Sequence, residues 1–545
     1  MSEDNHKQSV IMQAGILAAA GVVVRIIGLL YNTPLVHIIG DEGFGYYDSA
    51  YAAYSIVLMI SSFSIPSAVS KVMAHKLALG EYNNAYRLFK AALIYVTVVG
   101  LVAGGFVFFG AGLLVKMRGS VLPLRILAPT ILLSGFLGVL RGFFQAQHSM
   151  VRTSLSQILE QIFNAGISVL MAYVLVKIAR NIPGANVPSF GAAGSTIGTG
   201  AGVLASLLFL IFVFFRHKKR IEAKVAADTT HNVDSYKDIF KLIFQVVTPF
   251  ILSTGLYNVN SFMDKSFYQV ILMNTRKVEE AYVAFDLSAY AKANKIANIP
   301  IALAAAMGIA LIPQLSAYMA RNDLKMTRVQ IAKAIRVTMY VSIPAAVGLG
   351  VLARPVMKVI FPQPASLDLA SGMLIVLSLT VVLYGLSTLT QAVLQAVGRM
   401  NAPIVNASIA LVIHAALLVA LLYFGKVEHS LYYYGIATIV YSLVLSVLNG
   451  ISVRKYLGYE QEISKTFVRP TICSVAMGIV VYVLYKVIYV YTNINILALF
   501  ISVAAGAFIY FVLSLRWKVI TEDEMRALPK GAAFVRIAYR LKLFK

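Results

Sequence analysis

Residues 10–40 read VIMQAGILAAAGVVVRIIGLLYNTPLVHIIG, an apolar run long enough to cross a bilayer as a helix. Arg25 lies near the middle of this run, about 15 residues or roughly 22 Å of helix from either end. At that depth its side chain is too far from both interfaces to reach water along the helix. A permanently charged guanidinium inside a membrane span indicates a functional site, and its charge favours a hydrated cavity that receives an anion.

The composition of the whole chain indicates a membrane protein. Of its 545 residues, 59% are hydrophobic and only 13% are charged, and the mean hydropathy is +0.78. Apolar runs of spanning length recur from one end to the other, which soluble domains of this size do not show. The net charge of +24 is concentrated in short connections and tails. This is the positive-inside pattern of membrane proteins and not a footprint for nucleic acid.

Counting the apolar runs predicts an all-α polytopic membrane protein with about fourteen transmembrane helices. The expected helices are, in order, 10–36, 45–74, 87–115, 121–147, 152–178, 190–215, 238–271, 284–318, 328–353, 368–396, 402–424, 431–453, 468–491 and 494–515. Alternate connections are rich in lysine and arginine, beginning with residues 71–90, and the intervening ones are short and mixed. This alternation predicts that both termini are cytoplasmic.

Short matches in the same order along the chain indicate an internal repeat. Ser49-Ala-Tyr-Ala matches Ser288-Ala-Tyr-Ala, and Gln145-Ala matches Gln395-Ala. They predict two six-helix lobes of the same orientation, related by a pseudo-two-fold axis along the membrane normal, with two further C-terminal helices. The expected divisions are an N-lobe at 1–215, a basic cytoplasmic linker at 216–237, a C-lobe at 238–456, the last two helices at 457–515 and a basic cytoplasmic tail at 516–545.

Cationic and amide side chains predict an anion-binding cavity between the lobes. Lys292 and Lys295 share one face of the eighth expected helix, which Asn298 flanks, and Asn32 lies on the Arg25 face of the first. The candidate substrate-binding residues are therefore Arg25, Asn32, Lys292, Lys295 and Asn298. For the two lysines, a snorkelling position at a helix end is an alternative explanation.

Two carboxylates are candidates for either a coupling or a structural role. Glu160 lies on a polar stripe of the fifth expected helix, together with two glutamines and an asparagine. This stripe either holds a coupling ion or forms interhelical hydrogen bonds, and Glu160 is also an alternative structural ion-pair partner for Arg25. Asp264 lies toward the outer end of the seventh helix, where a solvated helix end is the competing explanation.

Signatures of enzymes are absent from the sequence. It contains no G-x-x-x-x-G-K-[ST] motif for nucleotide phosphates, no H-E-x-x-H and no cluster of Cys and His with metal-binding spacing. A membrane-embedded glycosyltransferase or polymer ligase would need a long catalytic loop with acidic pairs, and no connection is long or acidic enough. We therefore expect a transporter and not an enzyme, with no catalytic residue, no metal and no cofactor.

The C-terminal tail carries a local signal of its own. Thr521-Glu-Asp-Glu524 predicts a capping box that opens a helix. The basic and aromatic residues 536–545 that follow are typical of a segment at the surface of an anionic leaflet. A plain solvated tail is the alternative.

Two motifs resemble the multidrug/oligosaccharidyl-lipid/polysaccharide exporter superfamily. Ile38-Ile-Gly-Asp-Glu-Gly-Phe-Gly-Tyr-Tyr resembles the signature that follows the first helix of its polysaccharide transporters. Leu140-Arg-Gly-Phe-Phe-Gln-Ala-Gln-His-Ser-Met150, with Ser156-Gln-Ile-Leu-Glu-Gln161 after it, is similar to the branch that contains the stage V sporulation protein B and the MurJ-type lipid II flippases of Gram-positive bacteria. The resemblance covers the whole chain.

The resemblance implies a flippase in the bacterial plasma membrane. It would move undecaprenyl-pyrophosphate-linked peptidoglycan precursor, lipid II, from the cytoplasmic to the outer leaflet. By position, Arg25 and Lys295 resemble cations of the family's first and eighth helices, and Asp48 resembles an acid at the start of its second helix, a further coupling or structural candidate. Tyr31 and Ser61 stand where some members have arginines, so the substrate contacts of those members do not carry over.

Elementary physics favours the same kind of substrate. A lipid-linked pyrophosphate has a charged head that cannot cross hydrocarbon and a tail that never needs to leave it. A cationic cleft that is open to lipid can carry the head by alternating access while the tail trails outside. The alternatives are a flippase for another lipid-linked oligosaccharide and a cation-coupled multidrug exporter, which would favour acidic residues at the cavity. We expect a monomer whose partners are the lipid-linked saccharide and membrane lipids, with cell-wall synthesis enzymes as further candidates and no nucleic acid.

Overall fold

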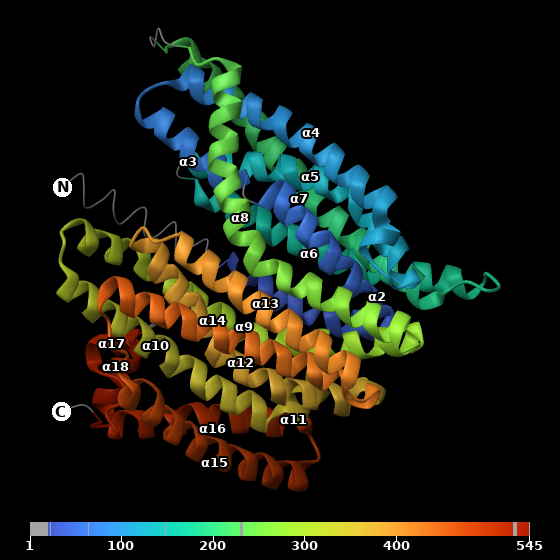
Figure 1. Ribbon diagram of the computed structural model, residues 1–545, viewed down its shortest axis with the longest axis vertical. Coiled ribbons are helices and arrows are strands. Elements are labelled where there is room, and N and C mark those ends of the chain that lie inside the picture. The colour runs from blue at the N-terminus through green and yellow to red at the C-terminus, as the bar shows by residue number, and fades with distance from the viewer. Residues whose placement is uncertain are drawn as a thin grey trace. The chain divides into compact units, whose positions relative to one another are not determined.

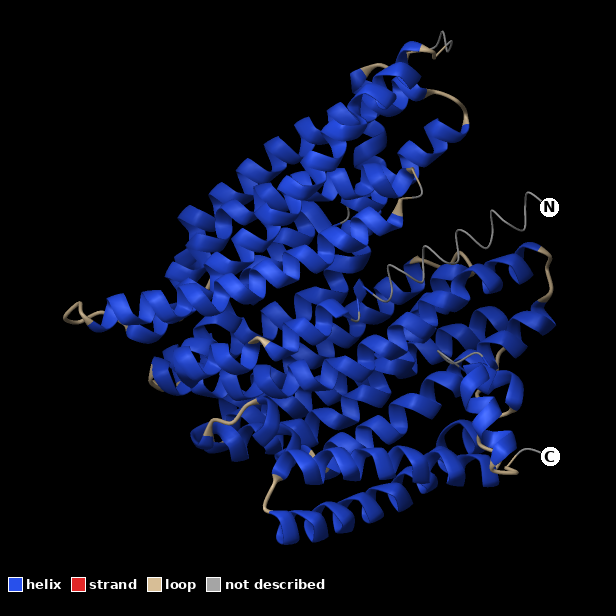
Figure 2. Ribbon diagram, turned by 180° about the vertical axis from the view of Figure 1, so that it is seen from behind, coloured by secondary structure: helices blue, strands red, loops and turns tan. Residues whose placement is uncertain are grey.

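The computed structural model describes residues 20–21, 23–63, 65–147, 149–228, 233–526 and 531–543. Within these ranges every regular element is a helix and no strand occurs (Figure 2). Eleven helical segments of the described residues are long and apolar enough to cross a membrane. The all-α polytopic fold is therefore confirmed. The count of about fourteen spans stays a prediction, and residues 10–19 and 22 of the first expected helix, 10–36, lie outside the described residues.

Contacts divide the chain into two compact units, residues 1–288 and 289–545. The helices of the first unit are α2 (Asn32–Leu58), η1 (Met59–Phe63), α3 (Ile65–Ala78), α4 (Tyr82–Leu114), η2 (Arg118–Ser120), α5 (Val121–Ala146), α6 (Met150–Arg180), α7 (Val187–Ala226), α8 (Tyr236–Gln269), η3 (Val270–Thr275) and the start of α9 (Glu280–Ala320) (Figure 1). This division follows contacts and falls beyond the basic linker, so the expected lobe boundaries stay predictions.

The second unit contains the rest of α9 and all later helices. They are α10 (Leu324–Val351), α11 (Ala353–Ile360), α12 (Pro364–Ala396), α13 (Asn401–Phe424), η4 (Val427–His429), α14 (Ser430–Leu457), η5 (Ser464–Val468), α15 (Arg469–Thr492), α16 (Asn495–Arg516), α17 (Glu522–Arg526) and α18 (Gly531–Arg540). Both α5 and α12 end at the alanine of the repeated Gln-Ala pair, which agrees with the internal repeat seen in the sequence.

The connection expected after the first helix is a sharp break inside α2. Gly40 has φ 71° and ψ 179°, a backbone conformation that glycine adopts without the steric cost of a Cβ. The second expected helix, 45–74, is interrupted in the structure by the π-helical turn η1. Pro66 follows this turn at the start of α3. Because proline lacks the N–H that would continue the helical ladder, it accounts for the interruption.

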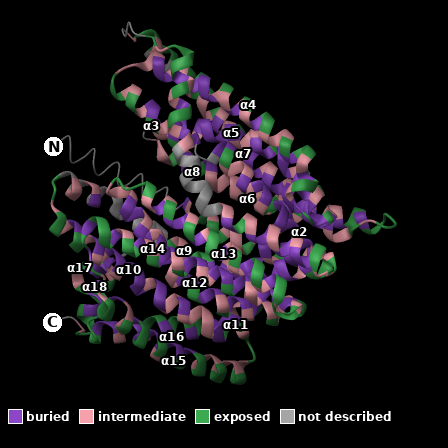
Figure 3. Cartoon of the chain, viewed as in Figure 1, coloured by how far each residue is buried: buried purple, intermediate pink, exposed green. Residues whose placement is uncertain are grey.

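Large apolar side chains lie exposed along the helices of both units, where Figure 3 shows exposed and buried residues on the same helices. Phe109, Phe424 and Tyr491 are each more than four-fifths exposed. In water such extensive apolar surface would drive association. In a membrane it is the surface that contacts lipid, which is why these helices need only part of their circumference for packing.

A row of glycines brings α7 against α6. Gly194, Gly198 and Gly202 recur every four residues and so lie on one face of α7. A Cβ at Gly198 would lie only 2.1 Å from Ser168 Oγ on α6. The Ser168 hydroxyl donates a hydrogen bond of 2.8 Å to the Ser195 carbonyl oxygen across the same interface. Small residues at the contact let the two backbones approach closely, which is how membrane helices associate.

Replacing Gly198 with alanine is expected to destabilise the protein by about 1–3 kcal/mol, because the new methyl group overlaps the backbone of Ser168. Gly166→Ala on α6 is the matched control, since no atom lies within 4 Å of its Cβ position. The measurement is the melting temperature of each purified variant in detergent. Equal melting temperatures for the two variants would contradict the packing described for α6 and α7.

The described residues of the basic connection expected at 216–237 extend α7 and contact the first unit. α7 continues through it to Ala226. Lys76 then forms ion pairs with Glu81, at 2.7 Å, and with Asp234, at 2.6 Å. The hydrogen bond from Lys76 holds the pKa of the Glu81 carboxyl below its usual value. Its small stabilising contribution is therefore present at neutral pH and is lost as the pH falls through that lowered pKa.

Candidate functional site

Arg25 lies in the helical stretch 23–30, which continues into α2 through the backbone hydrogen bonds at Tyr31. From Arg25 to the break at Gly40 is about 15 residues, or roughly 22 Å of helix. The Arg25 side chain is exposed, and no carboxylate among the described residues lies within ion-pair distance of it. The guanidinium is therefore presented on the surface of its unit and is not used in a described structural ion pair.

The residues on the Arg25 face are close to α6. A Cβ at Gly28 would lie 3.3 Å from Gln161 Nε2, which places the polar stripe of α6 beside this part of the first helix. Asn32 is buried, with 1% of its surface exposed, and its side-chain amide donates a hydrogen bond to the Gly28 carbonyl oxygen. Asn32 thus bonds to the backbone of its own helix, in contrast to the exposed Arg25.

Glu160 pairs with Arg141, a residue that the sequence reasoning did not select. Arg141 Nη2 on α5 donates to Glu160 Oε2 on α6 at 2.6 Å. The same guanidinium donates to Ser156 Oγ at 3.0 Å and to Ser206 Oγ at 3.2 Å. The alternative explanation of Arg25 as the ion-pair partner of Glu160 therefore does not hold. Arg141 connects α5, α6 and α7.

Asp48 is likewise paired inside the first unit. Its carboxylate lies 2.6 Å from the Lys265 ammonium of α8. One turn further along α8, Gln269 Nε2 donates to Ser49 Oγ at 2.8 Å. These two contacts attach α8 to α2. Asp264, the neighbour of Lys265, is 1% exposed, so the explanation of Asp264 as a solvated helix end does not apply.

The two candidate lysines of α9 have different surroundings within the second unit. Lys292 is fully buried, and its ammonium donates to Ser366 Oγ, in the first turn of α12, at 2.8 Å. The ammonium also lies 5.9 Å from the centre of the Phe361 ring, within the range of a cation–π contact. Lys292 therefore does not snorkel to water. Lys295 is partly exposed and Asn298 is exposed.

The structure thus places the candidate substrate residues on both units. Arg25, Lys295 and Asn298 have accessible side chains, whereas Asn32 and Lys292 are buried. Their joint action on a substrate stays a prediction. Among the described residues no group of three or more His, Cys, Asp and Glu side chains lies together where it could hold a metal ion.

The second unit also has an apolar groove between α10 and α15. Its volume is about 450 Å³. It is lined by Val347, Val351, Val475, Gly478, Ile479 and Tyr482. Ile479 is 62% exposed and Val475 is 48% exposed, so the groove opens on the surface of the unit. Such a groove suits a hydrocarbon chain and offers nothing to a charged group.

The chain is similar to known proteins over almost its whole length. The model of the family described as lipid II flippase MurJ matches residues 82–503. The lipid II flippase MurJ of Bacillus subtilis (strain 168) is 24% identical, over 94% of this chain and 96% of the relative. The stage V sporulation protein B of the same organism is 26% identical, over 96% and 98%.

Solved structures with the same fold include transporters of two kinds. A structure of the lipid II flippase MurJ in an inward closed conformation has a TM-score of 0.65 at 16% identity, and the match covers 91% of this chain and 97% of that one. An inward-facing multidrug resistance transporter of the MATE family has a TM-score of 0.60 at 13% identity, with 80% and 98% covered. At these identities the likeness establishes the fold alone.

Proposed function

Because this chain belongs to the MurJ family of lipid II flippases, we propose that it moves lipid II from the inner to the outer leaflet of the bacterial plasma membrane. It is a multi-pass membrane transporter, and the proposal assigns it no catalytic step. The substrate is an undecaprenyl-pyrophosphate carrying the peptidoglycan precursor, so its head is anionic and its tail is a long hydrocarbon.

The observation that carries the proposal is the exposed Arg25. A guanidinium binds phosphate oxygens through two parallel hydrogen bonds, and its charge does not depend on pH in the physiological range. Keeping such a cation in a membrane span costs free energy unless it has an anionic partner or water. No described carboxylate takes that role, which leaves the guanidinium available for the pyrophosphate of the substrate.

In this proposal, residues of both units bind the head of the substrate. Arg25 of the first unit and Lys295 of the second each offer an accessible cation, and Asn298 offers an amide beside Lys295. Alternating access of the lobes would then release the head on the opposite side of the membrane. Lys292 is buried against Ser366 and Phe361. It would make the electrostatic potential at the substrate site more positive without touching the substrate.

We propose that the apolar groove between α10 and α15 binds part of the isoprenoid tail. Its lining of valine, isoleucine, glycine and a tyrosine ring matches a hydrocarbon chain. Because the groove opens on the lipid-facing surface, the tail can stay in the membrane while the head moves. The two parts of the substrate would therefore be held by different sites.

A cation-coupled multidrug exporter is the second candidate, since the chain shares its fold with such transporters. An exporter of cationic drugs needs carboxylates that are available at its cavity. Here Glu160 is neutralised by Arg141 and Asp48 by Lys265. These two ion pairs favour the flippase, and a flippase for another lipid-linked oligosaccharide is the remaining alternative.

Ligand-induced stabilisation distinguishes these candidates, since a ligand that binds the folded protein raises its melting temperature. We expect purified protein to be stabilised by lipid II and less by undecaprenyl-pyrophosphate linked to an unrelated saccharide. A lipophilic cationic drug should have no effect. Stabilisation by the drug and not by lipid II would favour the multidrug exporter.

The proposed orientation places both termini and the connection after α7 in the cytoplasm. In a Cys473→Ser background, we expect Ala227→Cys to resist an impermeant thiol reagent in intact cells and to react after the cells are opened. Cysteines at residues 40–43 and Asn181→Cys should react in intact cells. Labelling of Ala227→Cys from outside would contradict the proposed topology.

A further inference from the structure

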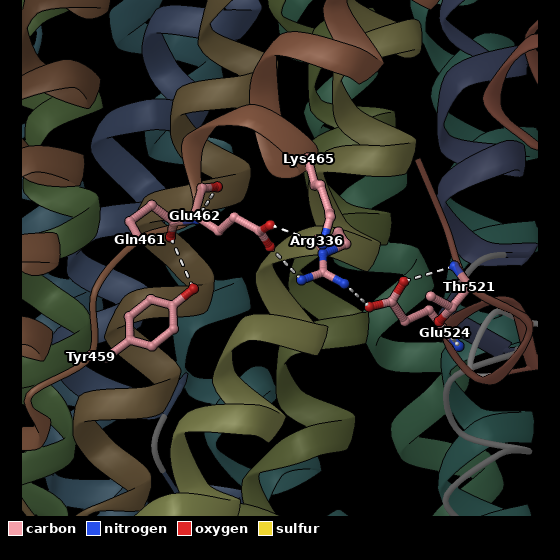
Figure 4. A network of polar contacts seen from close by, with 7 residues as sticks. All are labelled: Arg336, Tyr459, Gln461, Glu462, Lys465, Thr521 and Glu524. Carbon is pink, nitrogen blue, oxygen red and sulfur yellow. Dashed lines mark hydrogen bonds and ion pairs between the residues drawn. The ribbon is translucent and has the colours of Figure 1, made fainter. Parts of the chain in front are cut away.

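The C-terminal tail is anchored at one end of the second unit. The predicted capping box is confirmed, since the Thr521 backbone N–H donates to Glu524 Oε2 at 2.9 Å and the Glu524 N–H bonds to Thr521 Oγ. Glu524 also pairs with Nη1 of Arg336 in α10. Nη2 of the same guanidinium pairs with Glu462 at 2.6 Å (Figure 4). The start of the tail is therefore held in a fixed place on α10.

α17 and α18 are in turn held together. The Tyr539 hydroxyl of α18 donates to Glu522 Oε2 of α17 at 2.6 Å, and Arg526 pairs with the same carboxylate at 2.6 Å. On its inner face, α18 buries Gly531, Val535 and Ala538. A Cβ at Gly531 would lie 2.0 Å from the Met525 carbonyl oxygen. The tail is thus a packed element and not a solvated extension.

The outer face of α18 and the turn after its end at Arg540 combine apolar and cationic side chains. Phe534, Ile537 and Leu541 are each more than two-fifths exposed. Arg536, Arg540 and Lys542 are exposed among them, and no carboxylate of the described residues lies within ion-pair distance of these three cations. We call these six side chains the α18 outer face. A face that is both apolar and basic is typical of helices that lie in a membrane interface.

α18 packs near the end of α16, the last helix long and apolar enough to span a membrane. The Phe534 ring lies 6.2 Å from the ring of Phe511 in α16. Phe511 precedes the end of α16 at Arg516 by five residues, or about 7.5 Å of helix. Exposed Trp517 and Lys518 follow directly. α18 therefore lies beside the last turns of α16, and because the end of a membrane-spanning helix lies near the lipid headgroups, we expect α18 to lie at the membrane interface.

We propose that the α18 outer face, together with the end of α16, is a binding surface for anionic phospholipid headgroups. The cations would contact the phosphates while Phe534, Ile537 and Leu541 enter the boundary of the acyl chains. Two observations select lipid as the occupant. The face is continuous with the lipid-facing end of α16, and its charge is complementary to an anionic leaflet. This surface is separate from the substrate site and does not depend on the proposed function.

Trp517 makes the proposal directly measurable, because it is the only tryptophan of the chain and it lies exposed at this surface. The full-length protein is reconstituted in phosphatidylcholine vesicles that contain either brominated phosphatidylglycerol or brominated phosphatidylcholine at the same mole fraction. Bromine quenches tryptophan fluorescence only at short range. We expect the anionic lipid to quench Trp517 more strongly than phosphatidylcholine does. Each cation should enrich the anionic lipid near the surface by at most about fivefold. In molar salt the difference in quenching between the two lipids should be smaller.

The matched variants remove equal charge in two places. Arg536→Gln/Arg540→Gln/Lys542→Gln should lose at least half of the preference for the anionic lipid. Lys219→Gln/Lys237→Gln/Lys241→Gln, which removes three exposed cations of the first unit, should keep it. All six positions are exposed, so both proteins should melt at the wild-type temperature. Equal quenching by the two lipids in the wild type, or a full preference in the α18 variant, would overturn the proposal.

Discussion

Arg25→Ala is expected to abolish transport while the protein remains folded and inserted. The side chain is exposed and makes no described ion pair, so its removal should cost ligand binding far more than packing. Losing a bidentate, charge-assisted contact to a pyrophosphate corresponds to about 2 kcal/mol or more, or a fall in affinity of roughly thirtyfold. The measurement is complementation of a strain depleted of the wild-type protein, at matched expression.

Arg454→Ala is the control, because Arg454 is an exposed arginine at the end of α14 whose contact to Glu460 lies in solvent. It should complement fully. At Lys295, arginine should keep partial function and alanine little, since the site needs a cation more than a particular shape. Normal growth of the Arg25→Ala strain would refute the assignment of this residue to the substrate.

Breaking the Arg141–Glu160 pair is expected to have the second largest effect, this time on stability. Arg141→Met leaves the Glu160 carboxylate without its partner. Removing one partner of a fully buried ion pair costs about 3–5 kcal/mol of stability. The side chains are 16% and 31% exposed, so we expect about 2 kcal/mol. The Arg141→Met/Glu160→Gln protein should be more stable than the sum of the single changes predicts, in a double-mutant cycle of thermal unfolding.

The same variants test the role of Glu160 in coupling. If its carboxylate serves only to hold Arg141, Glu160→Gln should slow transport through altered packing and leave its dependence on sodium or proton gradients unchanged. If the wild type needs such a gradient and the glutamine variant transports equally with and without it, Glu160 is instead the coupling site. Additive single and double changes in stability would separately contradict the pairing.

The membrane fold could be predicted because its signal is local. The apolar runs, the basic connections and the Gln-Ala pairs can each be recognised within a short stretch of sequence, and the structure ends α5 and α12 at the two Gln-Ala pairs. The break at Gly40 also falls where a connection was expected. The π-helical turn η1 was not foreseen, although Pro66 directly after it is a recognisable cause.

The ion pairs were not predicted, because the sequence alone does not show which residues far apart along the chain meet in space. Arg141 is 19 residues from Glu160, and Lys265 is 217 residues from Asp48. A search for an arginine near the end of α5 could have found the first pair, because Arg141 lies in the motif at residues 140–150. Lys265 carries no comparable signal.

The difference between Lys292 and Lys295 shows a further limit. Helical spacing correctly places them on one face, but their exposure depends on what packs there. Ser366 and Phe361, at and before the start of α12, cover Lys292. Residues three apart on a helix can therefore share a face and still differ in how accessible they are to a ligand. The spacing of residues in the sequence does not reveal this difference.

The most direct test of the central claim is the sidedness of lipid II in cells depleted of this protein. Intact cells are treated with a membrane-impermeant probe that binds lipid II, and the bound fraction is compared with the total extracted lipid II. We expect the accessible fraction to fall while total lipid II rises, with recovery on expression of the wild type and not of Arg25→Ala. An unchanged accessible fraction, together with accumulation of another lipid-linked saccharide in the inner leaflet, would contradict the assignment of lipid II as the substrate.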